Sequence, residues 1–423
     1  MLALLVTGLP VFVVFLILNV TGVFLFFGSS GFSMLVDSMY ATATFSSLPA
    51  VPLFIIMGEI LFGCGAMDAV FKSLDDLVGR VRGRQYVLSL LASAVIGALS
   101  GAAMAVAGLL GRSLLPAMIK RGYNKKLTLG TVLGGASLDP IIPPSNLAVL
   151  IAALADVSTS GMLIGGIIPG LILMVVFIIY TLVRVSLDPS LAPDVSLEVD
   201  LGAKSPWYLS IARLLPCAVV FFMVMGLIML GVATPTEAAA TGVAGALIAG
   251  LIYRGLSWKL IQQALMTATT VSSTLLVVMC AAAMFSQLLA FSRGTQEIVN
   301  LAQQLLVGPN LMLVMMLGLP FVLFMFLDQV ALMMILIPVY QPLLKHYGFD
   351  PIWFWTMFLM VVTSGGLSPP FGYLLFALKS AVPDISLTEI YAAAWPFLWL
   401  LCIGILVVAL FPQTVLFLPG LFR

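Results

Sequence analysis

LPAMIKRGYNKKLTLGTVLGGASLDPIIPPSN, residues 115–146, recurs in altered form as PLLKHYGFDPIWFWTMFLMVVTSGGLSPPFG, residues 342–372. Each copy has a cationic turn, an apolar run and a proline pair, Pro143-Pro144 in the first and Pro369-Pro370 in the second. A proline pair breaks a helix because proline lacks an amide hydrogen and its ring clashes with the preceding turn. Lipid cannot satisfy the freed backbone groups, so such breaks line polar cavities or lie inside protein. The duplicated break therefore predicts the binding site of a secondary transporter.

Composition places the chain in a membrane. The 423 residues are 62% hydrophobic and only 8% charged, with a mean hydropathy of +1.20. Apolar runs of about 20 residues recur without strand-like alternation, which is typical of membrane-spanning helices and not of a barrel. The net charge of +1 gives no surface for a polyanion, so nucleic acid is not an expected partner. We expect an all-α polytopic protein of the lipid bilayer.

Charge decides the topology of the apolar segments. These segments are expected at residues 2–28, 46–66, 86–111, 127–155, 161–183, 208–231, 235–253, 262–291, 311–344, 352–378 and 391–412. Segment 86–111 lies between two basic loops, 68–84 and 112–126, which would face opposite sides if it crossed once. Because cationic loops stay on the cytoplasmic side, a re-entrant hairpin is favoured. The small residues 97–102 allow a tight turn.

A second hairpin is expected over 311–344, with its turn at residues 326–329. This topology places the N-terminus in the cytoplasm, with all Lys and Arg except Arg293, Lys345 and Arg423. The first hairpin then opens to the cytoplasm and the second to the outside. The two repeats are therefore expected to be inverted, an arrangement that suits alternating access.

The expected division of the chain follows these repeats. Residues 1–85 provide scaffold helices and a basic loop, and 86–160 the first half of a transport domain. Residues 161–261 hold scaffold helices, a polar linker at 184–207 and a connector, and 262–310 lead into the second repeat. Residues 311–380 form the second transport half, and 381–423 the C-terminal helix.

Ionisable residues within apolar segments are costly and usually functional. Asp328, at the second predicted turn, is a candidate ligand for Na⁺, which prefers oxygen donors, and also a candidate helix N-cap. Asp139 is expected either to order the first break or to help bind a cation. Glu237 follows Thr234 at the spacing of a capping box. Glu59 has no assigned role.

Oxygen donors gather at both breaks. Backbone carbonyls near the glycines and several side chains form a predicted Na⁺ cage: Gly135, Ser145, Asn146, Asp328, Thr363, Ser364 and Gly365. Helices that restart after each break point their positive dipole ends inward, which favours a carboxylate substrate. The predicted substrate-binding residues are Pro144, Ser145, Asn146, Ser368, Pro370 and Gly372.

Equipment for enzymatic catalysis is sparse. The only histidine, His346, lies in a predicted exposed turn, and the chain has no phosphate-binding Gly-Lys-Ser/Thr loop. A membrane-embedded enzyme acting on a lipid-linked substrate lacks a nucleophile here. A channel formed by two broken helices fits the long hairpins less well. We therefore expect a carrier driven by an ion gradient, without an organic cofactor.

Four stretches resemble the large membrane subunit (DctM-like) of TRAP transporters, the tripartite ATP-independent periplasmic transporters. They are GRSLLPAMIKRGYNKKLTLGTVLGGASLDPIIPPSN (111–146), GVATPTEAAATGV (231–243), FLDQVALMMILIPVYQPLLKHYGFDPIWF (326–354) and LSPPFGYLLFALK (367–379). The resemblance covers nearly the whole chain in the same order.

This resemblance implies a Na⁺-coupled elevator transporter in the bacterial inner membrane. A small four-helix membrane subunit (DctQ-like) and a periplasmic binding protein (DctP-like) would be its partners, and the substrate a small organic acid. By motif position, the ion-binding tips fall on Ser100-Gly101 and Asp328. The alternative is a stand-alone Na⁺-coupled carboxylate carrier. The first tip of the family commonly continues Ser-Gly-Ser-Ser, whereas this chain has Ala102 and Ala103, which excludes side-chain ligation at both positions.

Overall fold

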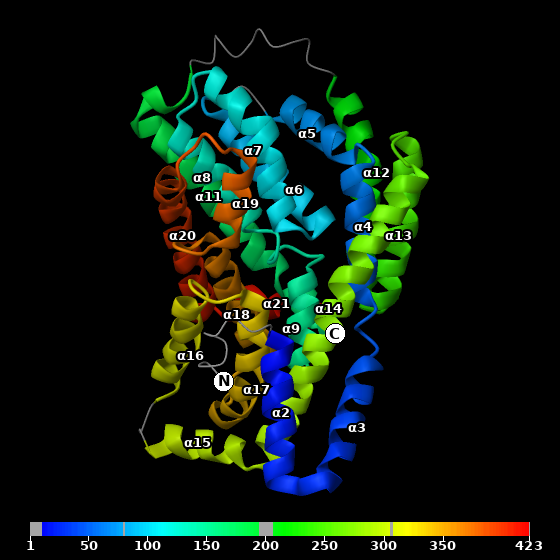
Figure 1. Cartoon of the computed structure of the whole chain (residues 1–423). Coiled ribbons are helices and arrows are strands. Elements are labelled where there is room, and N and C mark those ends of the chain that lie inside the picture. Colours follow the sequence, from blue (N-terminus) through cyan, green and yellow to red (C-terminus); the bar gives the residue numbers. More distant parts are fainter. Residues whose placement is uncertain (1–10, 79–80, 194–205, 305–307, 423) are drawn as a thin grey trace.

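The computed structural model describes residues 11–78, 81–193, 206–304 and 308–422, and within them every regular element is a helix (Figure 1). Seven of these helices are long and apolar enough to cross a membrane, or up to eight if the bent pair α4 and α5 forms one span. This confirms the prediction of an all-helical polytopic membrane protein. Parts of the predicted segment 2–28 and linker 184–207 lie outside the described residues, as does Arg423.

The helix bounds follow the predicted segments with several subdivisions. In chain order they are α2 (Val11–Phe27), η1 (Gly28–Gly31), α3 (Phe32–Ala43), α4 (Ala50–Gly63), α5 (Ala66–Leu77), α6 (Arg84–Ser100), α7 (Ala103–Lys120), α8 (Lys125–Ala136), α9 (Asn146–Leu154), α10 (Thr159–Gly165), α11 (Ile167–Leu187), η2 (Pro189–Leu191), α12 (Trp207–Met229), α13 (Pro235–Ile252), α14 (Trp258–Phe291), α15 (Gly294–Gln304), α16 (Pro309–Leu323), α17 (Gln329–Tyr347), α18 (Pro351–Leu367), α19 (Tyr373–Ala381), α20 (Leu387–Leu410) and α21 (Gln413–Leu421).

Helices α6 and α7 occupy the region of the predicted first hairpin, and its re-entrance into a membrane stays a prediction. Helices α6 and α7 pack against each other, and the turn between them is at Gly101, whose φ of +61° favours glycine. The hydroxyl of Tyr86, near the start of α6, accepts a hydrogen bond from the amide of Asn124, after α7. The start of α6 and the segment after α7 therefore lie together. The second arm is longer than predicted and runs to Lys120, because its apolar face continues through Leu115 and Met118.

Helices α16 and α17 occupy the region of the predicted second hairpin, and both predicted helix breaks are present. Residues 324–328 separate α16 from α17, residues 137–145 separate α8 from α9, and 368–372 separate α18 from α19. Each break contains a cis Pro-Pro bond. The first break is longer than predicted. Helix α8 already ends at Ala136, before Pro140, whose ring disfavours helical backbone in the residue that precedes it. The order of hairpin followed by broken helix thus occurs twice in the chain.

The two hairpin–break units meet side by side, while α4, α12 and α13 lie at the right of Figure 1 and α14 packs against α4. Helix α8 packs so closely on α20 that a methyl group on Gly130 would lie only 2.6 Å from the Phe397 ring. Helix α4 packs on α13 and α14 and also contacts α6 and α9. Helices α6 and α9 of the first hairpin–break unit are therefore held against α4.

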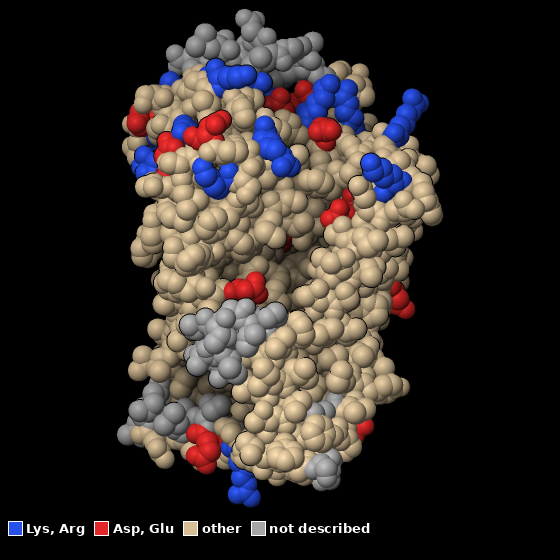
Figure 2. Space-filling view, in the orientation of Figure 1, with Lys and Arg blue, Asp and Glu red and all other residues tan. Residues whose placement is uncertain are grey.

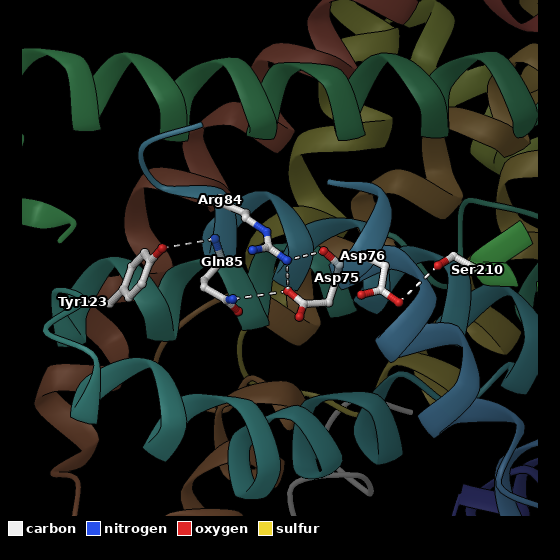
Figure 3. Close-up of polar contacts among 6 residues, drawn as sticks. All are labelled: Asp75, Asp76, Arg84, Gln85, Tyr123 and Ser210. Carbon is white, nitrogen blue, oxygen red and sulfur yellow. Dashed lines mark hydrogen bonds and ion pairs between the residues drawn. The ribbon is translucent and has the colours of Figure 1, made fainter. Parts of the chain in front are cut away.

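Lys and Arg side chains gather at the end of the molecule drawn uppermost in Figure 2. There, polar contacts connect α5 to its neighbours (Figure 3). Asp75 accepts hydrogen bonds from Arg84 (2.6 Å) and Gln85 (3.3 Å) at the start of α6. Asp76 accepts one from Ser210 of α12 (3.1 Å). Helix α5, which is bent by 67° from α4, thus connects the base of the first hairpin to α12.

Candidate functional site

A cavity of about 410 Å³ lies where the hairpins and breaks meet α4 and α14. Its walls combine segments that are far apart in the sequence. The polar residues and hairpin-tip residues that line it are Glu59, Ser100, Gly101, Ala102, Ala103, Asp139, Ser145, Asn146, Thr267, Gln329 and Tyr373. The face shown in Figure 2 is hollowed near mid-height, away from the cationic end.

Four helices begin at this cavity. Their first residues, Ala103 (α7), Asn146 (α9), Gln329 (α17) and Tyr373 (α19), all line it. The start of a helix carries unsatisfied amide groups and a partial positive charge. Side chains cap two of these starts: Ser145 on α9, and Asp328 on α17. Helices α7 and α19 begin without a side-chain cap. Four helix starts converge here, and the two without a side-chain cap, those of α7 and α19, create an environment that favours an anion.

Three side-chain oxygens in the same walls have no hydrogen-bond partner among the described residues. They are Oδ1 of Asp139, Oδ1 of Asn146 and Oε1 of Gln329. Asp139 is only 4% exposed. Buried acceptors normally have partners, and an orphaned group calls for an explanation such as an unseen ion. Helix α6 ends here at Ser100, which adds a partial negative charge. These oxygens can bind a hard cation.

Close approaches fix the shape of the first tip. A methyl group on Gly97 would lie 2.8 Å from Cβ of Asp139, so α6 lies directly on the first break. One on Gly101 would lie 2.8 Å from Nδ2 of Asn146. Between α4 and the tip, a methyl group on Gly58 would overlap the carbonyl of Ser100. The absence of side chains at these glycines lets the tip, the break and α4 meet.

The predicted site residues separate into two groups. Ser100, Gly101, Ser145 and Asn146 line the cavity. Asp328 precedes the lining residue Gln329, and its Oδ1 accepts a hydrogen bond of 2.9 Å from the amide of Ala331. Its predicted alternative role, helix capping, is therefore confirmed.

The other predicted residues are not among those that line the cavity. The hydroxyls of Thr363, Ser364 and Ser368 are fully buried and donate to carbonyls of their own helix at 2.6–2.9 Å. The glycines among them serve close packing, with Gly135 against Ser93, Gly365 against Phe324 and Gly372 against the carbonyl of Gly366. Pro144 is buried, and the carbonyl of Pro370 accepts a hydrogen bond from Tyr391 (2.8 Å). Ion or substrate binding by these residues stays a prediction.

Three polar lining residues were not predicted from the sequence: Thr267, Gln329 and Tyr373. Gln329 and Tyr373 are the first residues of α17 and α19. Because helices that restart after a turn or break are expected to point at the site, this expectation could have identified both residues. Thr267 carries no such signal. Glu59, left without a role, lines the cavity, whereas Glu237 forms the predicted capping box with Thr234.

The uncapped start of α7 allows a direct test. Ala102 is its N-cap residue and has no side-chain oxygen that could accept a hydrogen bond from the first turn. We expect Ala102→Ser to stabilise the protein by about 1 kcal/mol, because its hydroxyl can accept a hydrogen bond from the first turn. Ala103→Ser is the matched control, since a hydroxyl at the first helical position does not cap. Thermal unfolding of the purified variants measures both. An equal melting temperature for Ala102→Ser and the wild type would contradict the capping argument.

Comparison with known proteins agrees with the sequence resemblance. A family model described as the DctM component of the tripartite ATP-independent periplasmic transporter matches residues 1–414. The C4-dicarboxylate TRAP transporter large permease protein DctM of Pseudomonas aeruginosa is 27% identical over 94% of this chain and 91% of its own length. The ectoine TRAP transporter large permease protein TeaC of Halomonas elongata is 26% identical over 100% of this chain and 97% of its own. The sialic acid TRAP transporter large permease protein SiaM of Vibrio cholerae is 27% identical over 93% and 91%.

A solved structure has a similar fold. The Alcanivorax borkumensis YdaH transporter superposes with a TM-score of 0.69 over 91% of this chain and 89% of that chain, at 15% sequence identity. At this identity the similarity concerns the fold alone.

Proposed function

Because the chain belongs to the DctM family of tripartite ATP-independent periplasmic transporters, we propose that it is the large permease subunit of a Na⁺-gradient-driven uptake system for small organic acids. The observation that carries this proposal is the meeting of four helix starts with three unpartnered oxygens at one cavity. Such a cavity offers separate environments for an anionic group and for a coupling cation. Relatives named for C4-dicarboxylate, ectoine and sialic acid support an organic acid as substrate.

The substrate carboxylate lies at the starts of α7, α9, α17 and α19, where partial positive charge replaces the hydration that the anion loses. Na⁺ lies among Oδ1 of Asp139, Oδ1 of Asn146 and the end of α6 at Ser100, which provide the oxygen donors that a hard cation prefers. Binding of the cation offsets the charge of Asp139, so that substrate and Na⁺ favour each other's binding.

Transport follows from the repeated architecture. The two hairpins and two breaks move together as a transport domain against α4, α12, α13 and α14, in an elevator motion between inverted repeats. The cationic end seen in Figure 2 faces the cytoplasm of a bacterial inner membrane. A small membrane subunit and a periplasmic binding protein complete the system, and the binding protein delivers the substrate.

Uptake into proteoliposomes tests the proposal. Vesicles would hold this chain and its small membrane partner, and the loaded cognate binding protein would be added outside. We expect accumulation of a radiolabelled organic acid only with both an inward Na⁺ gradient and the binding protein. Uptake with Na⁺ but without the binding protein would indicate a stand-alone carrier. Equal uptake in K⁺ and Na⁺ would contradict Na⁺ coupling.

A further inference from the structure

Glu59 is a carboxylate inside the apolar helix α4, and it lines the cavity. The ion pairs found in the described ranges, Arg84–Asp75, Lys125–Glu389 and Arg213–Asp76, involve none of the residues that line this cavity. An ionisable side chain within a membrane segment is costly and normally has a partner or a function. Glu59 therefore has no cationic partner among the described residues that line the cavity.

Asp139 adds a second carboxylate to the same cavity. Its side chain is buried and its Oδ1 has no hydrogen-bond partner in the described part of the chain. Among the described residues that line the cavity, none is Lys, Arg or His. The side-chain charge of the cavity is therefore negative. The proposed Na⁺ offsets the charge of Asp139 but leaves that of Glu59, which a substrate with only anionic groups would meet as a like charge that opposes binding.

The two carboxylates lie on different parts of the molecule. Asp139 belongs to the first break and lies close to Asn146 and the first tip, where the proposed Na⁺ binds. Glu59 belongs to α4 and follows Gly58, which contacts the carbonyl of Ser100 at that tip. Glu59 therefore lines the cavity from α4, next to the residue of α4 that meets the hairpin. The cavity has one environment for a negative group and another for a positive group.

We propose that Glu59 binds a positively charged group of the substrate, and that the substrate is a zwitterion, a small organic acid that also carries an ammonium or amidinium group. This inference rests on the proposed function, because it takes the cavity to be the substrate site. The substrate carboxylate lies at the helix starts, and its cationic group forms an ion pair with Glu59. The cationic group then neutralises the negative charge of Glu59, which lies in the membrane helix α4.

The test compares two classes of compound in the reconstituted tripartite system with an inward Na⁺ gradient. The zwitterions are ectoine, glycine betaine and β-alanine, and the acids without a cationic group are succinate, malate and sialic acid. For each transported compound, the KM is measured by exchange from the vesicle lumen, where the binding protein is absent. The variants are Glu59→Gln, Glu59→Asp and, as a control at an exposed helix cap, Glu237→Gln. The Na⁺ concentration for half-maximal uptake is measured in parallel.

We expect uptake of a zwitterion, and a KM raised about 10- to 100-fold by Glu59→Gln, because a charge-assisted contact is lost. Glu59→Asp retains the charge and stays within a few-fold of the wild type, as does Glu237→Gln. Uptake restricted to acids without a cationic group would overturn the inference and leave the proposed function intact. An unchanged KM with a raised Na⁺ requirement would assign Glu59 to Na⁺ and also overturn it. Absence of Na⁺-driven uptake for every compound would instead contradict the proposed function.

Discussion

Asp139→Asn should abolish most Na⁺-driven uptake while the protein stays folded. Asp139 is the most buried carboxylate of the cavity, and its Oδ1 has no partner among the described residues. Asparagine keeps the size of the side chain and its packing on Gly97, but it removes the charge that attracts Na⁺. Loss of a charge-assisted contact costs about 1.5–3 kcal/mol, which corresponds to a Na⁺ affinity about 10- to 100-fold lower.

Thermal unfolding provides a readout that does not depend on transport. An ion that binds only the folded protein raises its melting temperature by an amount that grows with the ratio of its concentration to its Kd. We expect Na⁺, compared with K⁺, to raise the melting temperature of the wild type but not that of Asp139→Asn. In Na⁺-free buffer the variant should be at least as stable as the wild type, because the buried carboxyl group of Asp139 has no cationic partner there. Asp188→Asn, in the exposed segment after α11, is the control and should keep the Na⁺ effect.

An equal Na⁺-induced rise in melting temperature for Asp139→Asn and the wild type would show that Asp139 does not contribute to the ion site. The unpartnered oxygens of Asn146 and Gln329 and the carboxylate of Glu59 would then remain as side-chain candidates at this cavity.

Gly58→Ala should reduce uptake about 10- to 100-fold without unfolding the protein. A methyl group on Gly58 would lie 2.7 Å from the carbonyl carbon of Ser100, and backbone atoms cannot move aside as a flexible side chain can. The first tip must therefore shift away from α4, at the cost of about 1–3 kcal/mol that is typical of overpacking. Alanine also favours the helical state of α4 over glycine, so loss of folding is not expected.

Gly226→Ala is the matched control for this prediction. It lies in α12, and a methyl group there would meet no atom within 4 Å. Uptake by this variant should equal that of the wild type, and size-exclusion profiles of both variants should match it. Wild-type uptake by Gly58→Ala would mean that close seating of the tip on α4 is not needed for transport.

Local chemistry determined much of this fold from the sequence alone. The proline pairs at 143–144 and 369–370 break their helices wherever the chain packs, because proline cannot donate to a helix or tolerate the preceding turn. Gly101 marks the hairpin turn because few other residues adopt its positive φ. Asp328 and Glu237 cap helices through contacts within a few residues of themselves. Each of these features depends only on near neighbours in the chain.

Only the tertiary structure decided which oxygens face the cavity. Thr363, Ser364 and Ser368 carry the expected hydroxyls, but α18 is enclosed by other helices and its own carbonyls accept their hydrogen bonds. Asn146 instead lies at a helix start and keeps an unpartnered oxygen at the cavity. Glu59 joins this site through the packing of α4 against the hairpin, a contact between segments far apart in the sequence. Such contacts arise from the fit of whole helices, which the spacing of residues along one segment does not encode.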